Sequence, residues 1–145
     1  MIKNKNLKVR LIKNKKELGK VLTIREIIFI KEQKVSKEIE VDGLDKISKH
    51  IIVFYKAKPI GCARIRFVGK KAKLERIALL KGYRSKGIGK ILMYYLINYC
   101  KNKNFKNIFM NSQYYLKDYY SKFGFKSRGK PFTEAGIKHI EMYLN

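Results

Sequence analysis

Tryptophan is absent from this 145-residue sequence, and cysteine, histidine and proline occur only twice each. The two cysteines, Cys62 and Cys100, lie far apart and form no CxxC pair. The sequence therefore carries no disulfide framework, and apolar neighbours favour two buried free thiols. We expect a reducing, cytoplasmic setting.

Long apolar runs are also lacking. No uninterrupted run approaches the roughly 20 residues that span a bilayer, so we expect no membrane association. Half of the first ten residues are Lys or Asn, unlike a secretory signal. Hydrophobic residues make up 46% of the chain, enough for a real core. With no repeat or linker, residues 1–145 are predicted to form a single domain.

Acidic residues are scarce: 11 Asp and Glu stand against 35 Lys and Arg, for a net charge of +24. Such an excess attracts polyanions, which include nucleic acids, anionic membranes and phosphorylated cofactors. Charge alone does not choose among them. The lysines are spread along the chain beside abundant Ile and Asn, a pattern that compositional bias of a genome also produces.

Hydrophobic periodicity predicts a mixture of helices and strands. Helical spacing covers residues 16–33 and 88–99, and a shorter helix is expected at 114–122. The charged stretch 36–49 is predicted to be a loop or a short helix. Runs typical of strands cover residues 8–12, 50–55, 60–68, 72–80, 107–111 and 137–144. Short turns between the second, third and fourth runs predict an antiparallel meander.

A glycine-rich turn joins the strand at 72–80 to the helix at 88–99. Gly87 and Gly89 have no side chain to keep a ligand from the backbone. The first amides of a helix are unpaired donors at the positive end of its dipole. Arg84, Lys86 and Lys90 add positive charge. The turn therefore predicts a pyrophosphate site, although the glycines also suit a plain tight turn.

Two familiar phosphate loops do not fit this turn. A Rossmann GxGxxG loop needs a third glycine where Leu92 stands, and no βαβ unit surrounds the turn. A Walker A loop needs Lys after its second glycine. Gly82 and Gly87 have the Walker spacing, but Ile88 follows.

The order Arg84, two residues, Gly87, one residue, Gly89 resembles the acetyl-CoA-binding signature of the GNAT superfamily of N-acetyltransferases. The apolar strand residues 77–79 precede it, as in that superfamily. Residues 119–125, YYSKFGF, resemble the downstream (F/Y)YxKxGF segment of the same proteins. The resemblance covers nearly the whole chain.

Four further segments resemble the YjcF-like or ElaA-like subgroup. They are REIIFIKEQ at 25–33, EVDGLD at 40–45 with His50, NSQ at 111–113, and EAGIKH at 134–139 with Met142. Ser85 stands where Gly is frequent, and Leu116 where Ala is frequent. Backbone amides bind phosphate, so Ser85 leaves the site intact, whereas Leu116 narrows the expected cofactor groove.

The resemblance implies an α+β fold, with a mixed, mainly antiparallel sheet flanked by helices in the order β-α-α-β-β-β-α-β-α-β-β. It implies an enzyme that transfers an acetyl group from acetyl-CoA to a primary amine in a ternary complex. The implied cofactor-binding residues are Ile77, Leu79, Arg84, Ser85, Lys86, Gly87, Ile88, Gly89, Lys90 and Gln113. A strand N–H near Ile77 would polarise the thioester carbonyl.

Tyr120 is the candidate catalytic acid, by its place in the YYSKFGF segment. A phenol with a pKa near 10 is protonated at neutral pH and suits protonation of a departing thiolate. Packing in the core is the alternative role, and packing is expected for Tyr119. Gln113 fits either a cofactor contact or a helix cap.

The general base stays open among six candidates, which are Glu32, Glu40, Asp42, His50, Glu75 and His139. Each also suits a structural role, and we expect the acidic residues to pair with Lys or Arg at the surface, where such pairs contribute little. The spacing of Glu40, Asp42, Asp45 and His50 matches no ordinary ligand pattern, so no metal is expected.

Two other functions compete with the enzyme. A basic nucleic-acid-associated module would use the net charge, but the aromatic residues follow core periodicity and form no stacking platform. A catalytically silent sensor would bind CoA without turnover. The acceptor is left open among small amines, peptide N-termini, lysine side chains and antibiotics. The resemblance also leaves a homodimer open.

Overall fold

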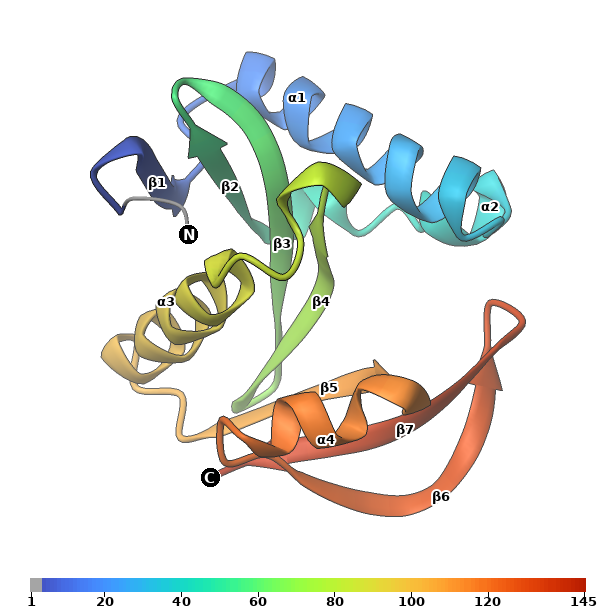
Figure 1. The fold of residues 1–145 in the computed structure, drawn as a ribbon. Helices are drawn as coiled ribbons and strands as arrows, with labels where there is room; N and C mark the ends of the chain where they lie inside the picture. The colour runs from blue at the N-terminus through green and yellow to red at the C-terminus, as the bar shows by residue number, and fades with distance from the viewer. Residues whose placement is uncertain (1–3) are drawn as a thin grey trace.

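The computed structural model describes residues 4–145, in which seven strands form one sheet in the order β1-β2-β3-β4-β5-β7-β6 (Figure 1). Four consecutive strands make an antiparallel meander: β1 (Leu7–Leu11), β2 (Lys49–Tyr55), β3 (Lys58–Val68) and β4 (Lys71–Leu79). The other part is also antiparallel and contains β5 (Asn107–Gln113), β7 (Ile137–Leu144) and β6 (Lys126–Glu134). The two parts join through a parallel pairing of β4 with β5.

Helices cover both faces of the sheet. On one face lies α1 (Lys15–Arg25), which begins at Asn14, whose side chain accepts a hydrogen bond from the Glu17 amide. A π-helix (Glu26–Glu32) continues it, and α2 (Lys37–Glu40) follows. Val21, Ile24 and Ile28 of this segment pack on Ile52, Phe54 and Cys62.

The other face is covered by α3 (Ile88–Asn102) and α4 (Lys117–Ser121). Ile88, Leu92, Met93, Leu96 and Ile97 recur at helical spacing and form the buried side of α3. They pack into the main core with side chains of β2, β3, β4, β5 and β7. The sheet is therefore the middle layer of three.

The sheet divides where β4 meets β5. In the described part of the chain, these strands pair only through Lys71–Asn107, Ala72–Ile108 and Lys73–Phe109. Beyond those residues they separate, as Figure 1 shows. This separation positions the candidate site.

The observed element order confirms the predicted β-α-α-β-β-β-α-β-α-β-β succession and the meander. The helix predicted at 16–33 is divided between α1 and the π-helix, and 36–49 contains the short α2. A 3-10 turn (Tyr114–Leu116) opens the helix predicted at 114–122.

Periodicity did not identify β6, although the resemblance implied a strand there. Every residue of this edge strand is exposed, and its pairing with β7 shifts between Arg128 and Phe132, around Pro131. An exposed edge strand buries neither face, so no apolar alternation marks it.

Cys62 and Cys100 are buried free thiols, as predicted. Burial raises the pKa of the Cys62 thiol to about 12 and that of Cys100 to about 11. Neither is a reactive thiolate at neutral pH. Within residues 4–145, the helices are too short or too polar to cross a membrane.

Candidate active site

A cavity of about 720 Å³ occupies the space between the diverging strands β4 and β5. Residues of the π-helix and α2 close one side of it, and the β6–β7 turn closes another. Of the residues singled out from the sequence, the cavity is lined by Ile77, Leu79, Arg84, Ser85, Gly87, Gly89, Lys90, Gln113 and Tyr120.

The glycine-rich turn forms one end of this cavity. Gly87 adopts a left-handed conformation, with φ of 87°, and is the N-cap residue of α3. Because glycine has no side chain, no side-chain hydrogen bond caps this helix. The first amides of α3 thus have no side-chain cap, which suits an anion. Lys90 lines the cavity, whereas Lys86 is exposed outside its lining. Ile88 is buried in the core, so only its backbone is available to a ligand.

The guanidinium of Arg84 is hydrogen-bonded within the protein. Its Nε donates a hydrogen bond to the Leu79 carbonyl at 2.9 Å. Its other two nitrogens donate to both carboxylate oxygens of Glu32, at 2.7 and 3.0 Å. These hydrogen bonds lower the pKa of Glu32. Arg84 therefore ties the turn to β4 and to the π-helix.

The cavity side of β4 carries an irregularity. Arg76 has a left-handed φ of 54°, and the pairing with β3 shifts near this point. Ile77 and Leu79 follow, beyond the last residue that pairs with β5. Their strand edge is therefore available to an extended ligand, which can add to the sheet as a further strand does.

Tyr120 is buried on α4 and lines the cavity. Burial raises the pKa of its phenol well above 10, and Tyr119 and Tyr115 add to the effect. Tyr119 also lines the cavity, rather than only packing as expected. Its hydroxyl lies 2.7 Å from the point that a Cβ on Gly89 would occupy, so the absence of a side chain there makes room for it.

Gln113 stands at the end of β5 and donates a hydrogen bond from Nε2 to the Gln33 side chain at 3.0 Å. Gln113 is the N-cap residue of the 3-10 turn that begins at Tyr114, but its side chain makes no hydrogen bond to that turn. The helix-cap alternative is therefore wrong. The contact links the two walls of the cavity across 80 residues of sequence.

Most of the acidic candidates belong to a network of ion pairs on the α1 face of the sheet. Arg25 binds Glu40 and Asp45, and Arg64 binds Asp42, Asp45 and Glu75. Arg66 and Lys73 also contact Glu75, and Arg76 contacts Glu40. Both Arg25 and Arg64 are 1% exposed. The expectation of surface pairs is therefore wrong for this group, which is largely buried.

Sequence reasoning missed the arginines of this network. Arg64, Arg66, Glu75 and Arg76 are charges of both signs inside strands, between apolar residues, and that is the signal available in the sequence. A charge is rarely buried without a partner, so oppositely charged strand residues indicate a buried pair.

The network also bears on the general base. Burial opposes the charge of Glu75, but the hydrogen bond from Arg66 and the nearby Arg64 dominate and lower its pKa to about 2. A hydrogen bond from Arg64 likewise lowers the pKa of Asp42. Such carboxylates are weak bases. Burial lowers the pKa of His50, which bonds the Asp45 carbonyl and lies outside the cavity lining.

The sequence model of the acetyltransferase (GNAT) domain matches residues 20–145. The N-acetyltransferase YjcF of Bacillus subtilis is 36% identical over 137 residues, covering 94% of this chain and 98% of its own.

Solved structures share the fold. ElaA of Escherichia coli superposes with a TM-score of 0.87 at 21% identity, covering 96% of this chain and 99% of its own. A GNAT family acetyltransferase from Elizabethkingia anophelis, solved with acetyl-CoA bound, has a TM-score of 0.67 at 20% identity and 96% coverage of both chains.

Proposed function

This chain belongs to the GNAT acetyltransferase family and is an acyltransferase, and on that premise we propose that it moves an acetyl group from acetyl-CoA to a primary amine. The transfer is direct, in a ternary complex of enzyme, acetyl-CoA and amine. The observation that carries the proposal is that an anion-receptive helix terminus and an unpaired strand edge line one cavity.

The donor is bound along the β4 side of the cavity. The α3 amides after Gly87, with Lys90, hold the pyrophosphate. The pantetheine amides hydrogen-bond the free edge of β4 near Ile77 and Leu79. A backbone N–H of that edge polarises the thioester carbonyl, which gains negative charge when the amine attacks.

Tyr120 supplies the proton for the leaving thiolate. Its raised pKa keeps the phenol protonated at neutral pH, so it is an acid and not a base in the resting enzyme. Burial removes competing water, which strengthens a hydrogen bond from the phenol to the developing thiolate.

Two measurements test the donor and the reaction. Titration calorimetry should show saturable binding of acetyl-CoA. Release of CoA should then depend on a primary amine, tested with butylamine, a peptide with a free N-terminus, a lysine peptide with a blocked N-terminus, and an aminoglycoside. Binding without turnover of any amine would instead favour a sensor, and no binding would contradict the proposal.

Tyr120→Phe tests the acid. We expect kcat to fall about 100-fold or more, because the proton donor is removed, with acetyl-CoA affinity unchanged. Tyr94→Phe is the matched control, since Tyr94 is exposed on α3 and outside the cavity lining. Unchanged turnover in Tyr120→Phe would show that Tyr120 is not the acid.

A further inference from the structure

His139 occupies a definite face of the sheet. It lies on β7 directly opposite Gln113 of β5 and Phe132 of β6. Residues directly opposite in antiparallel strands project to the same face. The Gln113 side chain bonds Gln33 after the π-helix, so His139 is on the face that α1 and the π-helix cover. It is 6% exposed and lines the cavity.

Tyr120 approaches the same cavity from the opposite face. It packs in the core cluster that contains Ile140 and Met142. These residues alternate with His139 along β7, and successive strand residues project to opposite faces. The cavity between β4 and β5 therefore has a phenol on its α4 side and an imidazole on its α1 side.

The tautomer of His139 is determined by one hydrogen bond. Its Nδ1 lies 2.7 Å from the Ile137 carbonyl oxygen. A carbonyl only accepts, so Nδ1 carries the proton and the neutral ring has its lone pair on Nε2. The ring is further held by stacking on Phe132, with centroids 6.0 Å apart and planes inclined by 27°.

A carboxylate stands beside that lone pair. Glu134 Oε2 lies 3.7 Å from His139 Nε2, too far for a hydrogen bond but close enough to stabilise an imidazolium. Glu134 also accepts a hydrogen bond from Asn111 at 3.3 Å. Unlike Glu40, Asp42 and Glu75, it forms no ion pair with an arginine of residues 4–145.

The other charged groups nearby are engaged elsewhere. On β7, Lys138 lies over the Tyr114 ring and Glu141 pairs with Arg128 of β6. Across the cavity, Glu32 is paired with Arg84. From β5, the residues on this face are the uncharged Asn111 and Gln113. Glu134 is therefore the charge that most directly faces the imidazole.

We propose that His139 is the general base of the acyl transfer and that Glu134 orients and stabilises it. This inference rests on the proposed function. As the amine nitrogen attacks, the C–N bond forms and the thioester C–S bond breaks. The amine proton goes to His139 Nε2, and the Tyr120 proton goes to the sulfur. Solvent then returns a proton from the imidazolium to the Tyr120 phenolate, which restores both groups.

The first test is spectroscopic and needs no acceptor. The chain has only two histidines, so ¹⁵N-labelled protein and its His50→Gln variant assign both imidazoles. At a pH of about 8, where an ordinary imidazole is neutral, we expect the Nδ1–H tautomer for His139. An Nε2–H tautomer would overturn the proposal, because the lone pair would not face the cavity.

The second test is kinetic and uses butylamine, or whichever of the amines named under the proposed function gives the highest rate. His139→Gln should lower kcat/KM about 100-fold or more, with acetyl-CoA affinity unchanged. Added imidazole should partly restore the activity of His139→Ala. His50→Gln is the matched control, because His50 lies outside the cavity lining, and it should keep the wild-type kcat/KM.

Glu134→Gln should lower kcat less than His139→Gln does, with acetyl-CoA affinity unchanged, because the imidazolium loses its partner, and Glu38→Gln should leave kcat unchanged. A His139→Gln enzyme with wild-type kcat/KM would overturn the proposal. Wild-type protein that binds acetyl-CoA but turns over no amine would contradict the proposed function instead. In that case the ¹⁵N spectra would still test whether the lone pair of His139 is on Nε2.

Discussion

At the scale of single residues, Glu75 shows how this basic chain uses its few acids. Its carboxylate lies among Arg64, Arg66 and Lys73. Glu75 lines the cavity, and its side chain is 7% exposed. Removing one member of a buried charged group leaves the others without compensation. The three cations can therefore lie side by side only because this carboxylate compensates their charge.

Glu75→Gln should lower the free energy of unfolding at pH 7 by about 3 kcal/mol, because buried cations lose their partner. The pKa of Glu75 is lowered from 4.5 to about 2, so its contribution is present above about pH 4.5 and is lost as the pH falls toward 2. Urea unfolding should therefore separate the variant from wild type at pH 7 and bring them together near pH 2.

Glu38→Gln is the control for this measurement, since Glu38 is exposed on α2. It should change the free energy of unfolding by less than about 0.5 kcal/mol at either pH. A Glu75→Gln difference that stays constant with pH would contradict the ionic explanation and point to packing.

At the scale of elements, β4 connects the two parts of the sheet. It pairs with β3 over most of its length and with β5 over three residues, so its second half presents an open edge. The close contact with β3 at Gly61 holds this half in place. A Cβ there would lie 2.5 Å from Leu79 Cδ2 and 3.0 Å from the Ala78 carbonyl oxygen.

Gly61→Ala should lower the free energy of unfolding by about 1–3 kcal/mol, because the new methyl group displaces Leu79 or separates the strands. Acetyl-CoA affinity should fall with it, since Leu79 lines the cavity. Gly19→Ala, in α1 with nothing within 4 Å of its Cβ, should instead stabilise by up to about 1 kcal/mol. Urea unfolding and calorimetry measure both; equal effects would contradict the steric argument.

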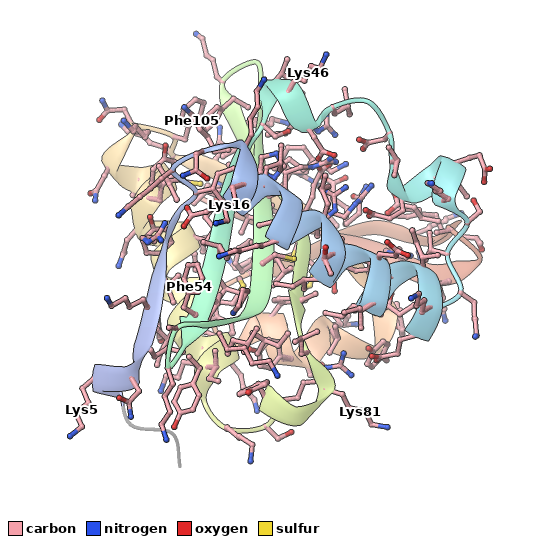
Figure 2. The ribbon with its side chains drawn as sticks, turned by 90° about the horizontal axis from the view of Figure 1, so that it is seen from above. Lys5, Lys16, Lys46, Phe54, Lys81 and Phe105 are labelled. Carbon is pink, nitrogen blue, oxygen red and sulfur yellow. The ribbon has the colours of Figure 1, made fainter. Side chains whose placement is uncertain are left out.

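At the scale of the whole molecule, charge is the dominant property. The net charge is +24, and lysines such as Lys5 and Lys81 extend outward at the periphery in Figure 2. Four of the eleven acids, Glu40, Asp42, Asp45 and Glu75, are taken up by the network under α1, and the rest of the molecule keeps a large cationic excess. Like charges at the surface repel one another and destabilise the compact state.

Added NaCl should therefore raise the midpoint of thermal unfolding, since the Debye length shortens to about 10 Å at 0.1 M and screens this repulsion. The buried pairs of Arg25 and Arg64 are screened much less. Acetyl-CoA affinity should weaken over the same range because its phosphates lose long-range attraction. A midpoint that falls with salt would show that attractive surface pairs outweigh repulsion.

The sequence by itself determined the elements whose signals are local. Periodicity placed α3 and the strands of the meander, because a helix or strand that covers a core repeats its apolar residues at a regular interval. The turn from Arg84 to Gly89 likewise carries its own signal, since the glycines and the helix start that define it are adjacent in sequence. The free thiols followed from the apolar neighbours of Cys62 and Cys100.

Only the tertiary structure decided which groups face one another. Arg84 meets Glu32 across 52 residues, and Gln113 meets Gln33 across 80, so neither pairing has a local pattern. Four of the six candidate bases, Glu32, Glu40, Asp42 and Glu75, proved to be held by arginines. The strand register placed His139 and Tyr120 on opposite faces of one cavity. Ion-pair partners and sheet faces depend on long-range packing, which periodicity along the chain does not encode.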